Sequence, residues 1–167
     1  MLMIISCTHM SPKEKELQNN INKTLNLEMF ETVQQGSIKI SYKEFRKKFK
    51  YISVVYLEDG CSSCYSKFID WQKKMDSNTI PNDYTVLFVI EGFSYDQFMS
   101  RVMDIEPIKD RYYTIIDIDY KYLHSNKSVP KWIIDSSILI DPENKVKLVG
   151  APWLTEDMMK LFKNICN

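Results

Sequence analysis

The sequence predicts an α/β fold in which helices cover both faces of a central sheet. Dense β-branched and apolar runs alternate with helical patterns through the middle of the chain, and a short hairpin and a last helix follow them. This alternation is typical of layered α/β proteins. The length of 167 residues and a hydrophobic share of 44% suit one domain with a substantial core, and neither a repeat nor a linker divides the chain.

Residues 11–49 are expected to hold an N-terminal helix and a lead-in to the main domain. Ser11 can accept a hydrogen bond from the first turn, Pro12 suits that turn, and Glu14 completes a capping box. Apolar residues then recur at helical spacing and predict a long apolar helix face: Leu17, Ile21, Leu25 and Met29. The stretch 36–45 alternates in polarity and predicts a short strand or turn.

The main domain is expected over residues 50–167. Three apolar, β-branched runs predict buried strands, over 51–57, 83–90 and 111–119. Helical patterns predict three helices, one starting at Ser62, one over 94–103 capped by Ser94, and one over 155–166 capped by Thr155. A Pro-Glu-Asn turn between two short apolar runs predicts a hairpin over 136–150. Asp117 and Asp119 are expected to mark the exposed end of the third strand.

The charge balance excludes one class of partner. Lys and Arg total 22, and Asp and Glu also total 22, so the formal net charge is zero. A nucleic-acid-binding protein would show a basic footprint, and no nucleic-acid partner is therefore expected. No apolar run approaches the roughly 18 residues of a membrane-spanning helix, so membrane contact is expected only through a lipid anchor.

Residues 1–10 resemble the signal end of a bacterial lipoprotein. An apolar run ends in a small residue followed by Cys7, which is the arrangement of a lipobox, and a polar stretch follows at once. In that family the signal is cut before the cysteine, whose thiol then carries the lipid. Only six residues precede Cys7 and none is charged, whereas a secretory signal has a basic start and about 7–15 apolar residues. We expect a signal remnant and lipid-anchor segment here, with an ordinary apolar terminus as the alternative.

Two cysteines three positions apart, Cys61 and Cys64, stand between a predicted buried strand and a predicted helix. A redox dithiol needs one thiol that ionises easily and a second that can attack the mixed disulfide. At the start of a helix, free amide hydrogens and the helix dipole stabilise a thiolate at the first cysteine. Gly60 permits the sharp turn into that helix. On this interpretation Cys61 is the exposed nucleophile and Cys64 the shielded resolving thiol.

Two other interpretations of the pair stay open. A zinc site needs two further ligands at usable spacing, but the remaining cysteines and histidines lie far from the pair in sequence, so no metal is expected: Cys7, His9, His124 and Cys166. Alternatively, the two cysteines are small core residues without chemistry.

The order of the predicted elements resembles that of the thioredoxin-like superfamily. It runs strand, C-x-x-C, helix, strand, helix, strand, and then the hairpin that contains ILIDPENKV. The resemblance covers roughly residues 50–166 and is closest in style to the membrane-anchored thiol–disulfide oxidoreductases of the bacterial periplasm. It implies a thioredoxin-like central mixed sheet flanked by helices, with the N-terminal helix as an extension.

The resemblance also implies a function. The chain would exchange thiols and disulfides on exported or cell-envelope proteins, in the periplasm or cell envelope, with the cytoplasm as the alternative location. Cys61 would attack and Cys64 would resolve the mixed disulfide, without a metal or an organic cofactor. The partners would be protein thiol or disulfide substrates and an upstream redox partner that resets the pair.

The sequence departs from the family pattern at three places. Gly60 stands where a tryptophan usually precedes the first cysteine, and Val55 stands where thioredoxins bury an acid. The position of the usual cis-proline, just before the penultimate strand, falls at Asp135 or Ser136, five or six residues after Pro130.

Carboxylates near the pair are expected to oppose its reactivity. Glu58 and Asp59 precede the pair and Asp135 is expected opposite it, and negative charge raises the pKa of a neighbouring thiol. The main alternative function is a thioredoxin-fold binding or scaffold module whose cysteines form a static disulfide, and the missing cis-proline is its best support. A more distant alternative is a peroxidase that uses Cys61 against hydroperoxides.

Overall fold

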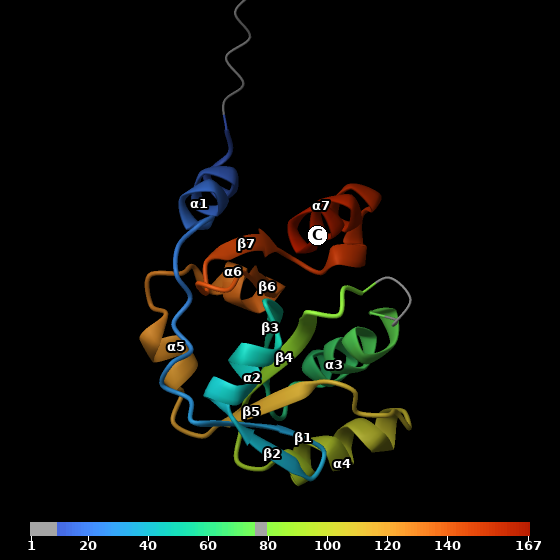
Figure 1. Cartoon of the computed structure of the whole chain (residues 1–167). Coiled ribbons are helices and arrows are strands. Elements are labelled where there is room, and N and C mark those ends of the chain that lie inside the picture. The colour runs from blue at the N-terminus through green and yellow to red at the C-terminus, as the bar shows by residue number, and fades with distance from the viewer. Residues whose placement is uncertain (1–9, 76–79) are drawn as a thin grey trace, which may run out of the picture.

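The computed structural model describes residues 10–75 and 80–167. Their strands form one seven-stranded sheet in the order β2-β1-β5-β4-β3-β6-β7 (Figure 1). The strands are β1 Thr32–Gln35, β2 Ile38–Ser41, β3 Tyr51–Glu58, β4 Tyr84–Glu91, β5 Tyr113–Asp117, β6 Ile138–Ile140 and β7 Val146–Val149. The three central strands β3, β4 and β5 run parallel, while β1, β2, β6 and β7 join by antiparallel pairing. The predicted mixed sheet is confirmed.

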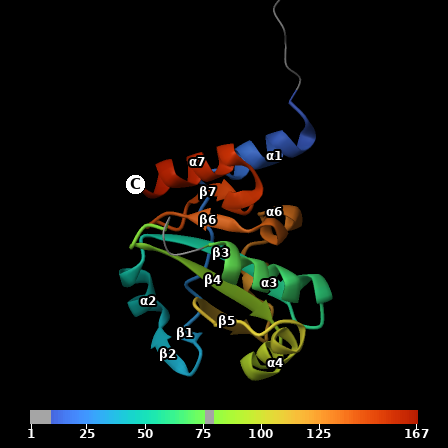
Figure 2. The ribbon, with the colours of Figure 1, turned by 90° about the vertical axis from the view of Figure 1, so that its right-hand side faces the viewer.

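Helices cover both faces of this sheet (Figure 2). They are α1 Pro12–Asn20, α2 Tyr42–Lys48, α3 Ser62–Lys74, α4 Tyr95–Ile105, α5 Lys121–Ser125, α6 Lys131–Ser136 and α7 Glu156–Cys166, with a 3₁₀ turn η1 at Pro152–Leu154. One core lies between the sheet and α2, α5 and α6, and a second lies between the sheet and α3, α4 and α7. Within the described ranges, none of these helices combines the length and the apolar character needed to cross a membrane.

The strand β3 contributes to both cores. Ile52 and Val54 pack on the α2 side, while Val55 and Leu57 pack on the α3 side, and all four are fully buried. Successive side chains of a strand point to opposite faces, so a dense apolar run is required where both faces are covered. β4 pairs with β3 along its whole length as far as Glu58. The carboxyl end of β3, where the two cysteines follow, is therefore rigidly held.

The predicted elements of the main domain are confirmed with small changes at their ends. The three predicted strands are β3, β4 and β5, the hairpin is β6 with β7, and the three helices are α3, α4 and α7. The hydroxyls of Ser11, Ser94 and Thr155 accept hydrogen bonds from the first turns of α1, α4 and α7, as the capping patterns predicted.

The N-terminal helix is shorter than predicted. α1 ends at Asn20, and a non-helical segment follows in which Leu25 and Leu27 are fully buried. The main-chain N–H of Leu25 donates to the carbonyl of Asn144 at 2.8 Å, which attaches this segment to the β6–β7 turn. The helical spacing was misleading because these leucines enter the core from a chain that docks on the sheet instead of continuing the helix.

The stretch 36–45 forms more structure than predicted. Ile38 begins β2, which pairs with β1, and β1 pairs in turn with β5, so this hairpin widens the sheet by two strands. Gly36 adopts φ +57° at the connection between them, a conformation that glycine takes without strain. Ser41 and Glu44 form a second capping box that begins α2, a helix that sequence reasoning missed.

The short helices α5 and α6, between β5 and β6, were also missed. Asp117 was expected at an exposed strand end, but it is only 2% exposed. Its carboxylate accepts hydrogen bonds from the N–H groups of Lys121 at 2.9 Å and Tyr122 at 2.8 Å. For Asp117 that expectation is wrong, because its carboxylate is buried and bonds the first N–H groups of α5.

Candidate dithiol site

The two cysteines lie where β3 turns into α3. β3 ends at Glu58, Asp59 and Gly60 form the turn, and Cys61 occupies the N-cap position of α3 with extended backbone angles. Gly60 adopts φ +90°, which confirms that this turn needs a glycine. Cys64 then lies one helical turn further, on the same side of α3 as Cys61.

A tyrosine and an arginine hold this turn in place. The hydroxyl of Tyr65 accepts from the N–H of Gly60 at 2.7 Å and donates to Oδ1 of Asp59 at 2.7 Å. Nη1 of Arg101, from α4, donates to the same hydroxyl at 3.0 Å and lies 3.5 Å from the Asp59 carboxylate. Because Tyr65 is only 6% exposed, this network is shielded and fixes the position of Cys61.

The two thiols are free, half-buried and close together. Cys61 and Cys64 approach each other to 2.8 Å. The Cys61 sulfur lies 3.1 Å from the hydroxyl oxygen of Ser63, and the Cys64 sulfur accepts from the N–H of Glu58 at 3.4 Å. This arrangement brings the second thiol close to the first.

The surroundings shift the pKa values of the two thiols in opposite directions. A hydrogen bond from the Cys64 side chain lowers the pKa of Cys61, and bonds from the Ser63 hydroxyl and from the helix amides act in the same direction. Burial raises the pKa of Cys64 to about 11, and its hydrogen bond to Cys61 adds to this effect. Cys61 is therefore the thiol prepared to ionise and Cys64 the one held protonated.

The expectation that carboxylates would raise the pKa of Cys61 is wrong. Nζ of Lys131 lies 2.6 Å from the Asp135 carboxylate and 3.3 Å from that of Glu58, and Asp59 faces Arg101. These cations compensate the negative charge, and of the two thiols it is Cys64, not Cys61, whose pKa the Glu58 carboxylate raises. The sequence could not show this compensation, since Lys131 comes from α6 and Arg101 from α4.

The dithiol opens into a pocket of about 360 Å³, lined by Tyr56, Glu58, Cys61, Ser63, Cys64, Lys67, Lys131 and Asp135. Of the two positions expected opposite the pair, Asp135 lines this pocket, while Ser136 lines a neighbouring pocket of about 390 Å³. Ser137 follows with φ +87° directly before β6, and the peptide bonds of the described residues are all trans.

Lys67 is a member of this pocket that sequence reasoning missed. It lies on α3 three residues after Cys64, and its Nζ donates to the carbonyl oxygens of Tyr56 at 3.3 Å and Asp135 at 2.6 Å. Burial lowers the pKa of Lys67, and the negative charge of an ionised Cys64 opposes that shift. Helical spacing from Cys64 was the available signal for Lys67.

Val55, which stands where thioredoxins bury an acid, is fully buried on the α3 side of the sheet.

Other sequence candidates do not join the dithiol. Cys166 is a free thiol, 4% exposed, at the end of α7 in the core on that side of the sheet, where burial raises its pKa to about 12. Cys7 and His9 lie outside the described residues, so the lipid-anchor prediction stays untested. Within the described ranges, no group of three or more His, Cys, Asp or Glu side chains is arranged to hold a metal ion.

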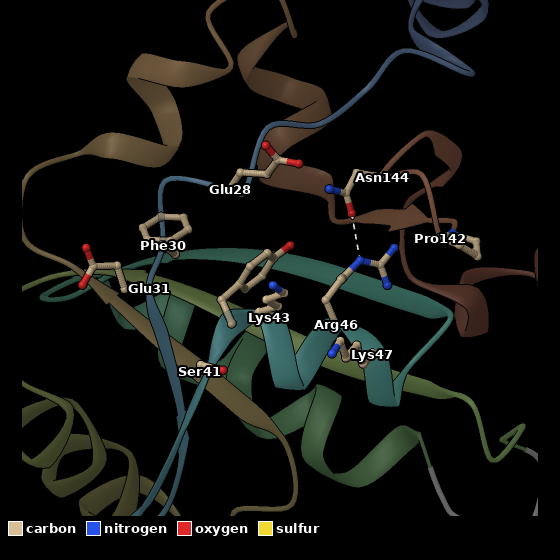
Figure 3. A pocket seen from close by; sticks show the side chains of 10 residues that line it. Glu28, Phe30, Glu31, Ser41, Lys43, Arg46, Lys47, Pro142 and Asn144 are labelled. Carbon is tan, nitrogen blue, oxygen red and sulfur yellow. Dashed lines mark hydrogen bonds between the residues drawn. The ribbon is translucent and has the colours of Figure 1, made fainter.

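A larger pocket of about 600 Å³ lies beside α2, near the amino end of β3 and thus at the opposite end from Cys61 (Figure 3). It is bounded by the segment before β1, by α2 and by the β6–β7 turn. Figure 3 shows Arg46 reaching across to Asn144, whose side-chain oxygen accepts from Nε at 2.9 Å. The described residues that line it include neither cysteine nor histidine, so this pocket supplies no group for thiol chemistry.

Comparisons with known proteins agree on the fold. No family model and no curated protein matches the sequence. Among solved structures, thioredoxin from Wuchereria bancrofti aligns with a TM-score of 0.57 at 13% identity, over 85% of this chain and 99% of that one. The pneumococcal exposed lipoprotein thioredoxin Etrx1 from Streptococcus pneumoniae gives 0.54 at 16% identity, over 80% and 97% of the two chains. The thioredoxin domain of the thiol-disulfide oxidoreductase BVU-2223 from Bacteroides vulgatus gives 0.52 at 16% identity, over 88% and 98%.

These likenesses show that the chain has a thioredoxin-like fold, carrying an additional N-terminal helix. The expectation drawn from the order of elements is thereby confirmed. A shared fold supports several activities, so the function depends on the chemistry of the site itself.

Proposed function

We propose that this protein is a thiol–disulfide oxidoreductase that uses Cys61 and Cys64. The observation that carries the proposal is the division of the two thiols: one at a helix N-terminus with a lowered pKa, the other one turn later with a raised pKa. The two residues approach to 2.8 Å, so the pair is placed to form an intramolecular disulfide. The thioredoxin-like fold and its likeness to thiol–disulfide oxidoreductases support the same class.

The exchange proceeds in two steps that use sulfur atoms alone. The Cys61 thiolate attacks a substrate disulfide, forms a Cys61–substrate disulfide and releases one substrate thiolate. Cys64 then loses its proton to solvent and attacks the Cys61 sulfur, which releases the second substrate thiolate and leaves a Cys61–Cys64 disulfide. Two electrons have passed to the substrate, and a dithiol of an upstream redox partner, which is itself oxidised to a disulfide, resets the pair. The reverse sequence oxidises a dithiol.

Reduction of insulin disulfides in dithiothreitol tests this activity. We expect the full chain to accelerate precipitation of the insulin B chain, and Cys61→Ser to abolish the acceleration. Cys64→Ser should instead accumulate a mixed disulfide at Cys61, because the resolving thiol is missing. Equal rates for the wild type and Cys61→Ser would favour a scaffold with a static disulfide. Hydroperoxide consumption that survives loss of Cys64 but not of Cys61 would favour a peroxidase.

We propose further that the substrates are exported or cell-envelope proteins and that Cys7 carries a lipid. The sequence pattern around Cys7 supports this, as does the likeness to an exposed lipoprotein thioredoxin. Mass spectrometry of the N-terminus of the protein from its native host gives the test. A diacylglyceryl group on Cys7 is the expected result, and an unmodified thiol there would contradict the anchor.

A further inference from the structure

We propose that Lys67 is a positioning residue that promotes ionisation of Cys64 for the resolving step. This inference rests on the proposed function, because it assigns a role within that exchange. Cys64 and Lys67 lie three positions apart on α3, a spacing that brings helix side chains together. Both residues also line the same pocket.

The ammonium group of Lys67 is fixed in this pocket rather than free in solvent. Its Nζ donates to the carbonyl of Tyr56 at 3.3 Å, near the end of β3, and to the carbonyl of Asp135 at 2.6 Å, in α6. Neither acceptor carries a formal charge, so no carboxylate is hydrogen-bonded to Lys67, and the Asp135 carboxylate acts on it only through space. Lys131, in contrast, lies against the carboxylates of Glu58 and Asp135.

The charges around Cys64 balance only when Lys67 is counted. Two carboxylates line the pocket, Glu58 and Asp135, and two ammonium groups, Lys67 and Lys131. The Tyr56 hydroxyl also faces the pocket but is bonded to the Glu91 carboxylate. Without Lys67 the surroundings would be net negative and would oppose a second anion. With Lys67, they can accommodate a thiolate on Cys64.

The resolving step needs this help at a defined moment. In the resting dithiol, the hydrogen bond to Cys61 and the charge on that sulfur help to keep Cys64 protonated. Once Cys61 is bonded to substrate, its sulfur is neutral and both of these effects disappear. Burial and the Glu58 carboxylate then remain as the obstacles to ionisation. The negative charge of an ionised Cys64 raises the pKa of Lys67, so the Lys67 ammonium in turn favours the Cys64 thiolate. The proton of Cys64 leaves to solvent, and its thiolate attacks Cys61.

The experiment measures Cys64 without any substrate. In the full chain carrying Cys61→Ser, the rate of Cys64 alkylation by iodoacetamide is followed against pH, with peptide mass spectrometry to separate this site from the other cysteines. We expect Lys67→Met to move the midpoint of the profile upward by about one pH unit, which is about tenfold slower alkylation at pH 8. Lys67→Arg keeps the charge and should retain the midpoint measured with Lys67 in place.

The controls separate a charge effect from a packing effect. Lys67→Gln removes the charge while keeping a hydrogen-bond donor, and it should shift the midpoint as Lys67→Met does. Lys74→Met, at the far end of α3, should leave the profile unchanged, since Lys74 pairs with Asp70. An unshifted midpoint in both neutral Lys67 variants, with native circular dichroism, would overturn the role of Lys67. Loss of insulin reduction together with an intact Lys67 effect would instead refute only the proposed function.

Discussion

Two chemically identical residues become different reagents at this site because of their nearest neighbours. Cys61 meets hydrogen-bond donors from the Cys64 side chain, the Ser63 hydroxyl and the first helix amides, all of which favour its charged form. Cys64 is more deeply placed, and burial disfavours its charged form. Pairs of titratable groups whose pKa values are pushed apart are characteristic of sites with divided chemical roles.

This division predicts selective alkylation of the reduced protein. At pH 7 to 8 iodoacetamide should modify Cys61 well before Cys64, because the lowered pKa of Cys61 leaves more thiolate there, while the pKa of Cys64 is about 11. The modified fraction of Cys61 should rise with pH and level off below the ordinary thiol pKa. Time-resolved peptide mass spectrometry provides the measurement. Equal modification of both cysteines at pH 7 would contradict the assignment of the nucleophile.

At the scale of elements, the start of α3 depends on a single hydroxyl. The Tyr65 hydroxyl accepts hydrogen bonds from the Gly60 N–H and from Arg101, and it donates to the Asp59 carboxylate. We expect Tyr65→Phe to lower the free energy of unfolding by about 1–3 kcal/mol, because the mostly buried Asp59 carboxylate loses its hydroxyl donor and the Gly60 N–H loses its acceptor. Urea denaturation of the reduced protein measures this. The matched control is Tyr120→Phe, since Tyr120 is 48% exposed, and an equal loss in both variants would contradict the role of the network.

The buried Asp117 carboxylate at the beginning of α5 allows a second prediction at this scale. Asp117→Ala removes a buried carboxylate that accepts from two main-chain N–H groups, and it should cost about 1–3 kcal/mol of unfolding free energy. Asp119→Ala is the control, because the Asp119 side chain is 68% exposed. Thermal melting of both variants checks the difference. A melting temperature for Asp117→Ala within error of that for Asp119→Ala would show that the cap is unimportant.

Across the whole molecule, Arg46 joins segments that are distant in sequence. From α2 it donates to the Asn144 side chain at 2.9 Å and to the Phe49 carbonyl at 2.7 Å, and it also donates to the carbonyl of Asp141. It thereby connects α2 and the start of β3 to the β6–β7 turn, at the end of the sheet away from the dithiol.

Replacing this arginine should weaken the fold without touching the chemistry. We expect Arg46→Met to cost about 2–4 kcal/mol of unfolding free energy, since several carbonyl and amide oxygens lose a charged donor. Lys47→Met, on the same helix and beside the same pocket, should change stability by less than about 0.5 kcal/mol. Urea denaturation measures both, and the alkylation profile of Cys61 should stay the same in both. A shifted Cys61 profile in Arg46→Met would show that the two ends of β3 are coupled.

Much of this architecture could be predicted from local patterns. The apolar runs gave the strands β3, β4 and β5, and the serine and threonine caps gave the starts of α1, α4 and α7, because burial on both faces and capping leave signatures within a few residues. The β1–β2 hairpin and the helices α2, α5 and α6 were missed or only partly seen. They are short, and docking against the sheet stabilises them more than their own sequences do.

The sequence by itself determined the thioredoxin-like fold class, the Cys61–Cys64 pair and the glycine turn before it, since each depends on neighbours along the chain. Only the tertiary structure decided the electrostatics of the pair. The cations that compensate its carboxylates come from α4 and α6, which the fold brings to the end of β3. The physical reason is that charge acts through space: a carboxylate two residues before a thiol matters less than the lysine or arginine that the fold places against it.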